Sequence, residues 1–162
     1  MNYNIRRIQE SEYERLIDFL YEAIFVPEGE QPPPKSIINA PELQVYVSDF
    51  GKKKDDICFV AEINKQIVGA VWVRVMNDYG HIEDGVPSFA ISLFKEYRGL
   101  GIGTALMKTM LKELGEKGYK KTSLSVQKAN YAVSMYKNVG FEIIDENEEE
   151  YIMVYEVTNN VK

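Results

Sequence analysis

The sequence predicts a mixed α/β domain, because runs rich in β-branched and aromatic residues alternate along the chain with segments of helical periodicity. The chain has 162 residues, which is enough for one domain with a sizeable core. Hydrophobic residues make up 45% of the chain and charged residues 27%, a composition typical of a folded globular protein. We therefore expect a single domain over residues 1–157, followed by a short polar tail at 158–162.

In the first half of the chain, caps, prolines and turn residues separate the expected elements. Ser11 and Glu14 form a capping-box pattern, which predicts the start of a helix. Four of the six prolines fall within residues 26–34, so this segment is expected to be an extended surface loop. The Asn-Lys pair at 64–65 separates two apolar runs as a hairpin turn would, and Gly69 indicates a bulge or a close approach. The elements expected here are a strand over 3–8, helices over 11–25 and 41–48, and strands over 57–63 and 66–76.

The second half of the chain continues the alternation of strands and helices. A polar loop over 77–87 leads into a strand, and Gly118 is the expected stop of the long helix that follows. The elements expected here are a strand over 88–94, a helix over 102–117, a strand over 122–126, a helix over 130–139, and strands over 141–144 and 151–157.

The most informative segment is 94–106, which reads Phe-Lys-Glu-Tyr-Arg-Gly-Leu-Gly-Ile-Gly-Thr-Ala-Leu. Its three glycines lie where a predicted strand passes into the N-terminus of a helix. The first amides of a helix have no partner within the helix, and the helix dipole favours an anion beside them. Glycine lets a phosphate approach the backbone because it has no Cβ. The junction therefore predicts an anion-binding loop that suits a phosphate.

Two common phosphate-binding loops do not fit the spacing of these glycines. A nucleoside triphosphate loop ends in Gly-Lys-Ser/Thr, whereas Gly103 is followed by Thr104 and then by alanine. The dinucleotide fingerprint needs glycines at its first, third and sixth positions. Counted from Gly99 the sixth position is Thr104, and counted from Gly101 it is Leu106. Nucleotide binding is therefore disfavoured, and a glycine-rich turn without a ligand is the plain structural alternative.

The pattern that remains, Arg98-x-x-Gly101-x-Gly103, resembles the pyrophosphate loop of the GNAT superfamily, the acyl-CoA-dependent N-acyltransferases. A second stretch is similar to the closing signature of the same family in order and spacing. It consists of Asn130, Ala132, Tyr136, Gly140 and Phe141.

The resemblance implies a GNAT fold, in which a central mixed and mostly antiparallel sheet of about seven strands is flanked by helices. In that fold a splayed pair of strands holds the acyl-CoA. The resemblance also implies acetyl-CoA as the acyl donor, and it implies no metal.

The resemblance assigns the diphosphate of coenzyme A to backbone amides of the glycine loop. Arg98 could add a positive charge, or it could instead pack against the loop and cap it. Leu93 occupies the strand position whose backbone contacts the pantetheine arm. Asn130 is implied to touch the cofactor, and a helix cap is its alternative role. The loop residues implied in cofactor binding are Arg98, Gly99, Gly101, Ile102, Gly103 and Thr104.

Transfer of an acetyl group from a thioester to an amine needs a proton for the departing thiolate. The family resemblance gives this role to Tyr136, because a phenol with a pKa near 10 is protonated at neutral pH. The same tyrosine also belongs to an apolar stripe at helical spacing, so a purely structural role stays open. That stripe consists of Ala132, Met135, Tyr136 and Val139.

The base that takes the proton of the amine is harder to assign. Glu83 is the first choice, since it lies in the loop that leads into the strand before the glycine loop. Asp84, His81 and an ordered water are the alternatives. Many relatives carry a carboxylate immediately ahead of this strand, whereas here Pro87 is followed by Ser88.

Charge and cysteine content narrow the expected partners and compartment. The formal net charge is -6 and the sequence pI is near 5.0, so neither nucleic acid nor an anionic membrane is an expected partner. Cys58 is the single cysteine, so no intrachain disulfide can form, which suits a reducing compartment. The chain contains no apolar run of about 18 residues. We expect a cytoplasmic protein.

The predicted function is N-acetyltransfer from acetyl-CoA to a primary amine of a small molecule or a peptide, by direct attack of the amine on the thioester. The alternative is a non-catalytic acyl-CoA-binding or sensor domain of the same fold. The identity of the acceptor and the preferred acyl length do not follow from the residues. A homodimer is compatible with the sequence.

Overall fold

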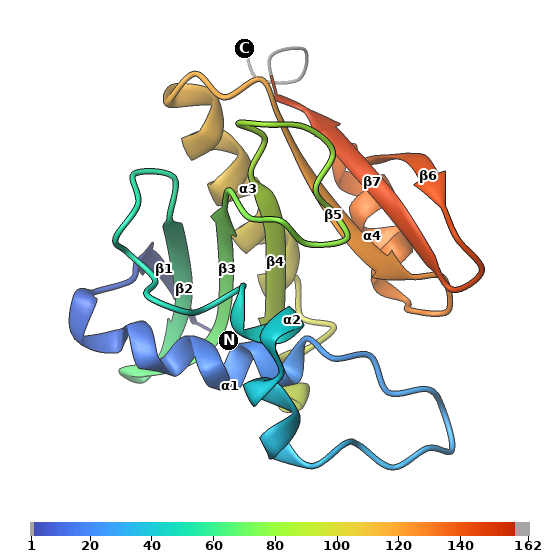
Figure 1. Cartoon of the computed structure of the whole chain (residues 1–162). Helices are drawn as coiled ribbons and strands as arrows, with labels where there is room; N and C mark the ends of the chain where they lie inside the picture. The colour runs from blue at the N-terminus through green and yellow to red at the C-terminus, as the bar shows by residue number, and fades with distance from the viewer. Residues whose placement is uncertain (1, 158–162) are drawn as a thin grey trace.

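The computed structural model describes residues 2–157, and the polar tail expected at 158–162 lies outside the described residues. One seven-stranded sheet runs through the molecule in the order β1-β2-β3-β4-β5-β7-β6 (Figure 1). Neighbouring strands are antiparallel except β4 and β5, which are parallel. The predicted mixed α/β fold with a mostly antiparallel sheet is thus confirmed. The strands are β1 (Asn4–Arg7), β2 (Ile57–Ile63), β3 (Gln66–Arg74), β4 (Ser88–Leu93), β5 (Lys121–Gln127), β6 (Glu142–Glu146) and β7 (Glu150–Glu156).

Helices cover both faces of this sheet. The longer helices α3 and α4 lie on one face, and the N-terminal helices α1 and α2 lie on the other (Figure 1). The α-helices are α1 (Leu16–Glu22), α2 (Pro41–Gln44), α3 (Ile102–Glu116) and α4 (Ala132–Val139), and the short 3-10 helices are η1 (Glu10–Arg15), η2 (Lys35–Asn39) and η3 (Lys95–Tyr97). Within the described part of the chain, no helix is long and apolar enough to cross a bilayer.

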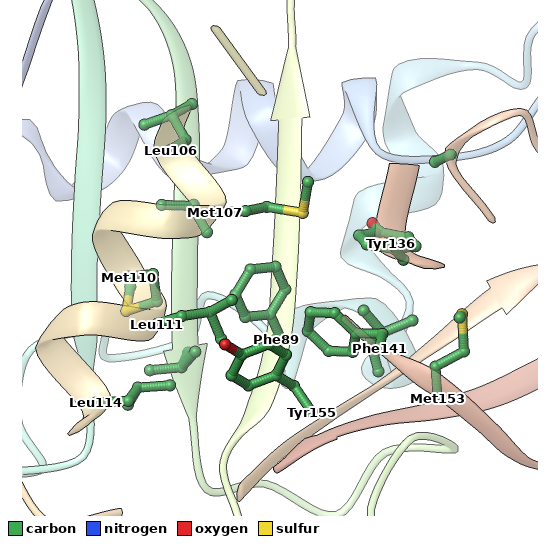
Figure 2. Close-up of a cluster of buried hydrophobic side chains, with 14 of the residues drawn as sticks. Phe89, Leu106, Met107, Met110, Leu111, Leu114, Tyr136, Phe141, Met153 and Tyr155 are labelled. Carbon is green, nitrogen blue, oxygen red and sulfur yellow. The ribbon is translucent and has the colours of Figure 1, made fainter. Parts of the chain in front are cut away.

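The larger of two hydrophobic cores fills the space between the sheet and helices α3 and α4. Leu106, Met107, Met110 and Leu114 line the inner face of α3 at helical spacing and are fully buried (Figure 2). The second core packs α1 against the other face of the sheet, with Trp72 fully buried at its centre. The central sheet is therefore held rigidly from both sides.

The helix expected over 11–25 is divided into the 3-10 helix η1 and the α-helix α1, which ends at Glu22, and its cap differs from the expected one. The expected box of Ser11 and Glu14 is wrong, because Glu12 is the residue whose carboxylate accepts the amide of Gln9 at 2.9 Å. Glu12 also accepts two hydrogen bonds from the Arg6 guanidinium, both at 2.8 Å. This bidentate pair fixes Glu12 from β1, so a tertiary contact decides where the helix starts.

The second helix is shorter than expected, ending at Gln44 instead of residue 48. Side chains of β3 donate hydrogen bonds to the carbonyl groups of residues that would otherwise have continued this helix. Arg74 Nη1 donates to the carbonyls of Val45 and Ser48 at 3.1 and 2.9 Å, and Trp72 Nε1 donates to that of Tyr46 at 3.1 Å. The chain therefore leaves α2 as an irregular turn that is pinned to the sheet.

Three local predictions about turns and stops are confirmed. Asn64 and Lys65 both adopt positive φ, at 49° and 67°, as the tight turn between β2 and β3 requires. Gly118 has a φ of 85° directly after α3, and the amide of Tyr119 returns to Leu114 at 3.0 Å. Gly69 lies beside an irregularity in the β2–β3 register, and a Cβ there would be 2.7 Å from the Leu93 side chain.

Candidate acyl-CoA site

Strands β4 and β5 are neighbours in the sheet, but they pair at one point only within the described residues. Ser88 lies opposite Ser123, and the amide of Ser123 donates to the carbonyl of Pro87 at 3.1 Å. Beyond this pair the two strands diverge (Figure 1). On its other side β4 pairs with β3 along its whole length. We call the opening between β4 and β5 the splay, and the Ser88–Ser123 pair its vertex.

The glycine loop connects the open end of β4 to α3. Gly99 and Gly101 adopt left-handed φ values of 75° and 86°, which glycine adopts without strain. The first helical hydrogen bond runs from the amide of Ala105 to the carbonyl of Gly101 at 3.2 Å. No backbone amide of residues 99–104 donates a hydrogen bond to any described residue. A set of free amides at a helix N-terminus is a site that favours an anion.

Gly103 serves a different purpose from the two glycines before it. It is buried, and a Cβ there would be 3.3 Å from Leu93 Cδ1 and 3.5 Å from Met135 Sδ. Its missing side chain lets β4, α3 and α4 approach one another at the open end of the splay. Leu93 is itself buried there, and its side chain belongs to the core against α3.

The Arg98 side chain forms hydrogen bonds with other groups of the protein. Its Nε donates to the carbonyl of Leu93 at 3.0 Å, and its Nη2 lies 3.2 Å from the carbonyl and 3.4 Å from the carboxylate of Glu22 in α1. These contacts match a residue that packs against the loop and closes it, which is one of the two roles left open by the sequence. The guanidinium ties the glycine loop to both β4 and α1.

Asn130 caps the first turn before α4. Its Oδ1 accepts the amide of Ala132 at 2.9 Å, so the capping contact expected from the sequence is present. Contact between Asn130 and a cofactor stays a prediction.

Tyr136 lies on the inner face of α4, with its ring 5.6 Å from that of Phe141 (Figure 2). Only 8% of the residue is exposed, and burial raises the pKa of its phenol above the ordinary value. The hydroxyl makes no hydrogen bond to any described residue, yet it is not one of the fully buried polar atoms that lack a partner. The ring is therefore part of the core, while the hydroxyl is neutral and available.

The expected bases lie in the loop before β4, near the vertex. Glu83 forms an ion pair with Lys121 at the start of β5, and its side chain is 54% exposed. His81 Nε2 lies 3.9 Å from the carboxylate of Asp84, and His81 Nδ1 is buried without a hydrogen-bond partner among the described residues. Glu83 as the base stays a prediction, and it requires the ion pair with Lys121 to open.

A cluster that the sequence did not reveal lies on the α1/α2 side of the vertex. The two oxygens of the Asp78 carboxylate accept hydrogen bonds from Ser88 Oγ and from the Tyr46 hydroxyl, each at 2.7 Å. Burial and the neighbouring Asp78 charge raise the pKa of Tyr46, so its hydroxyl stays protonated. No spacing pattern links residues 46, 78 and 88, and the polarity of the loop at 77–87 was the only signal available.

The model of the acetyltransferase (GNAT) family matches residues 13–141, which is most of the chain. This protein belongs to the GNAT family. The matched range includes β4, the glycine loop, β5 and α4.

Named relatives agree with the GNAT assignment. The chain is 32% identical over 98 residues to N-acetyltransferase 8B from Homo sapiens, covering 59% of this chain and 41% of the relative. It is 29% identical over 99 residues to an N-alpha-acetyltransferase from Sulfurisphaera tokodaii, covering 56% of this chain and 59% of the relative. The chain thus spans less than two thirds of the length of either relative.

Solved structures share the fold at low sequence identity. The PaiA N-acetyltransferase from Thermoplasma acidophilum, in complex with coenzyme A, superimposes with a TM-score of 0.66 at 21% identity, covering 96% of this chain and 99% of that one. The ribosomal-protein-S18-alanine N-acetyltransferase from Escherichia coli gives a TM-score of 0.67 at 14% identity, and the match covers 96% of this chain and 94% of that one.

The residues of this GNAT chain fit the diphosphate of coenzyme A. The free amides of residues 99–104, the exposed glycines and the positive end of the α3 dipole all favour an anion at the open end of the splay. Among residues 2–157 no group of three or more histidine, cysteine, aspartate or glutamate side chains is arranged to hold a metal ion.

Proposed function

We propose that this protein is an N-acetyltransferase that moves an acetyl group from acetyl-CoA to a primary amine of a small molecule or a peptide. The observation that carries the proposal is the splay, which has a loop of free amides at its open end and the neutral hydroxyl of Tyr136 on α4. The family match and the relatives named as N-acetyltransferases support it.

Binding of the acyl donor would rest on main-chain groups. The amides of residues 99–104 would hold the diphosphate, with Arg98 keeping the loop closed through Leu93 and Glu22. Among residues 2–157, the edge of β4 that faces β5 has no strand partner beyond Ser88, so it offers backbone groups to the amides of the pantetheine arm. This arrangement would aim the thioester into the splay.

Tyr136 would supply the proton that the departing sulfur needs. Its neighbours in the core keep the phenol neutral, and a neutral phenol can donate to a thiolate. The new amide bond forms as the amine nitrogen attacks the thioester carbon and the bond from carbon to sulfur breaks. Tyr136 then recovers its proton from solvent.

The peptide branch of the proposal has support from one relative. The chain is 29% identical over 82 residues to a [ribosomal protein bS18]-alanine N-acetyltransferase from Haemophilus influenzae, covering 51% of this chain and 52% of the relative. That relative acts on an alanine of ribosomal protein bS18, as its name states. The acidic character of this chain, with a net charge of -6, would also attract a cationic small amine.

The test combines calorimetry with coenzyme A and a thiol-release assay with acetyl-CoA. Spermidine, lysine amide, an aminoglycoside and an alanine-starting peptide would serve as acceptors. We expect saturable binding of coenzyme A and thiol release that depends on one acceptor class. Binding without turnover by any acceptor would instead favour the non-catalytic acyl-CoA-binding domain, and no binding would reject both functions.

A further inference from the structure

The loop between β3 and β4 brings one carboxylate to the vertex, on the face of the sheet opposite to Tyr136. Ser88 and Ser92 share one face of β4 because side chains alternate along a strand, and Ser92 Oγ donates to the carbonyl of Phe19 in α1 at 2.6 Å. Asp78, which accepts from Ser88 Oγ, therefore lies on the α1 side. Tyr136 packs in the core on the other side, against α3 and α4.

The Asp78 carboxylate is held in place by two hydrogen bonds and can still accept more. Ser88 binds one oxygen and Tyr46 the other, and each carboxylate oxygen can accept a second hydrogen bond. Asp78 is half-buried and forms no ion pair with any described residue. Other carboxylates around the site do have cationic partners, as Glu83 does in Lys121 and Glu22 does in Arg98.

Tyr46, which orients Asp78, is itself fixed by the sheet. Its carbonyl accepts from Trp72 Nε1, and Arg74 binds the carbonyls on both sides of it, at residues 45 and 48. Arg74 is buried and paired with the fully buried carboxylate of Asp56 at 3.1 Å. The hydroxyl of Tyr46 therefore reaches Asp78 from a rigid support, with Ser125 of β5 beside it and the charge of Glu150 in β7 within range.

We propose that Asp78 is the base for the acceptor amine, accepting a proton from the amine nitrogen at the vertex as that nitrogen attacks the thioester. This inference rests on the proposed acetyltransferase function. The acceptor first loses its ammonium proton to water and docks as a neutral amine. As the bond between nitrogen and carbon forms, the nitrogen becomes acidic and gives one proton to the free lone pair of Asp78. Sulfur leaves with the proton of Tyr136, and solvent reprotonates Tyr136 and removes the proton from Asp78.

Ser88, the first residue of β4, binds through its hydroxyl a carboxylate that the preceding loop supplies. The two proton transfers then take place on opposite faces of the sheet. Asp78 accepts the proton of the amine on one side of the splay, and Tyr136 donates a proton to the sulfur on the other.

The test is the substitution Asp78→Asn, which keeps the shape of the side chain, accepts from one of the two hydroxyls and can donate to the oxygen of the other. Using acetyl-CoA and the amine that gives most turnover, we expect kcat/KM for the amine to fall roughly 100-fold or more. The Kd for coenzyme A from calorimetry should stay within about twofold, because the amide loop is untouched. The matched control is Asp145→Asn on the exposed edge strand β6, which removes the same charge and should leave kcat/KM unchanged.

A second variant separates a chemical role from a merely structural one. Tyr46→Phe keeps the ring but removes one hydrogen-bond donor to the Asp78 carboxylate, so kcat for the amine should fall several-fold while the KM for acetyl-CoA stays unchanged. Asp78→Glu keeps the charge and should restore part of the activity lost in Asp78→Asn.

Three outcomes would overturn the inference. If wild-type protein turns over an amine and Asp78→Asn keeps more than a third of its kcat/KM, Asp78 is not the base while the proposed function stands. If Glu83→Gln suffers the loss instead, Glu83 is the base. If wild-type protein binds coenzyme A but acetylates none of the amines, the proposed function and this inference fail together.

Discussion

Ser88 and Ser123 form the one pair between β4 and β5 in the described chain, and each is also tied to residues 78–80 of the preceding loop. Ser88 Oγ donates to the Asp78 carboxylate at 2.7 Å, and Ser123 Oγ donates to the carbonyl of Gly80 at 2.6 Å. A single short segment thus holds both strands at the point where they part. The width of the splay and the place of the Asp78 carboxylate are set by the same contacts.

Replacing Gly101 with alanine should weaken binding of coenzyme A. Its φ of 86° is left-handed, so a Cβ there costs about 1–2 kcal/mol or forces the loop to turn its amides away. Calorimetry should show a rise in Kd of roughly 5- to 30-fold, since each 1.4 kcal/mol is a factor of ten in an equilibrium constant. Gly29→Ala is the matched control, because Gly29 has a φ of 84°, open space around its Cβ position and no part in the glycine loop. Equal effects on Kd from both variants would argue against the amide loop as the diphosphate site.

The substitution Tyr136→Phe should lower turnover while leaving the stability of the fold almost unchanged. The hydroxyl has no hydrogen-bond partner among the described residues, so its loss should change the free energy of unfolding by no more than about 0.5 kcal/mol. Turnover should fall roughly 100-fold, because the departing thiolate would lack its proton donor. Thermal unfolding and a thiol-release assay on the same preparation give both numbers. Retained turnover would remove Tyr136 from the mechanism and leave it as a core residue beside Phe141.

Arg98 offers a test of its two roles, using its partner Glu22. If Arg98 works by closing the loop, Arg98→Lys should raise the Kd for coenzyme A several-fold, because lysine lacks the fork that reaches both Leu93 and Glu22. Glu22→Gln should then also weaken binding, since it loosens the same closure. If Arg98 instead contacts the diphosphate directly, removing the Glu22 charge should leave binding equal or tighter. Calorimetry on both variants distinguishes the two.

Features set by short stretches of sequence could be predicted from the sequence. The turn at residues 64–65, the stop at Gly118 and the cap at Asn130 all depend on the conformation of one or two residues. The strands followed from runs of apolar residues, with only small shifts at their ends. The glycine loop was also recognisable, because its spacing is local.

Features that depend on distant residues could not be predicted in this way. The end of α2 is decided by Arg74 and Trp72, some thirty residues further along. The Asp78 cluster joins three separate segments through hydrogen bonds, and no sequence periodicity predicts these bonds. The sequence also gave no sign that Glu83 would be paired with Lys121.

Glu12 predicts a specific dependence of stability on acidity. Its hydrogen bonds from Arg6 lower the pKa of the Glu12 carboxyl from 4.5 to about 2. A carboxyl with a lowered pKa in the folded state stabilises the fold fully above its unfolded pKa, and this contribution disappears as pH falls through the folded pKa. Wild type should therefore be more stable than Glu12→Gln at pH 7, and the difference should shrink as pH falls from about 4.5 toward 2. Urea unfolding of both proteins at several pH values measures this difference in the free energy of unfolding. A difference that stays constant across that range would contradict the lowered pKa of Glu12.

The buried pair of Arg74 and Asp56 should be the most sensitive ionic contact in the fold. The two side chains are 7% and 0% exposed, and Arg74 also holds the turn that carries Tyr46. Asp56→Asn leaves the guanidinium buried without its counter-charge, which should cost about 3–5 kcal/mol in the free energy of unfolding. Asp49→Asn is the matched control, because Asp49 belongs to the same turn region but its side chain is 80% exposed. Urea denaturation should show a large loss of unfolding free energy for Asp56→Asn and almost none for Asp49→Asn. A loss below about 1 kcal/mol for Asp56→Asn would mean that the two backbone carbonyls alone hold Arg74.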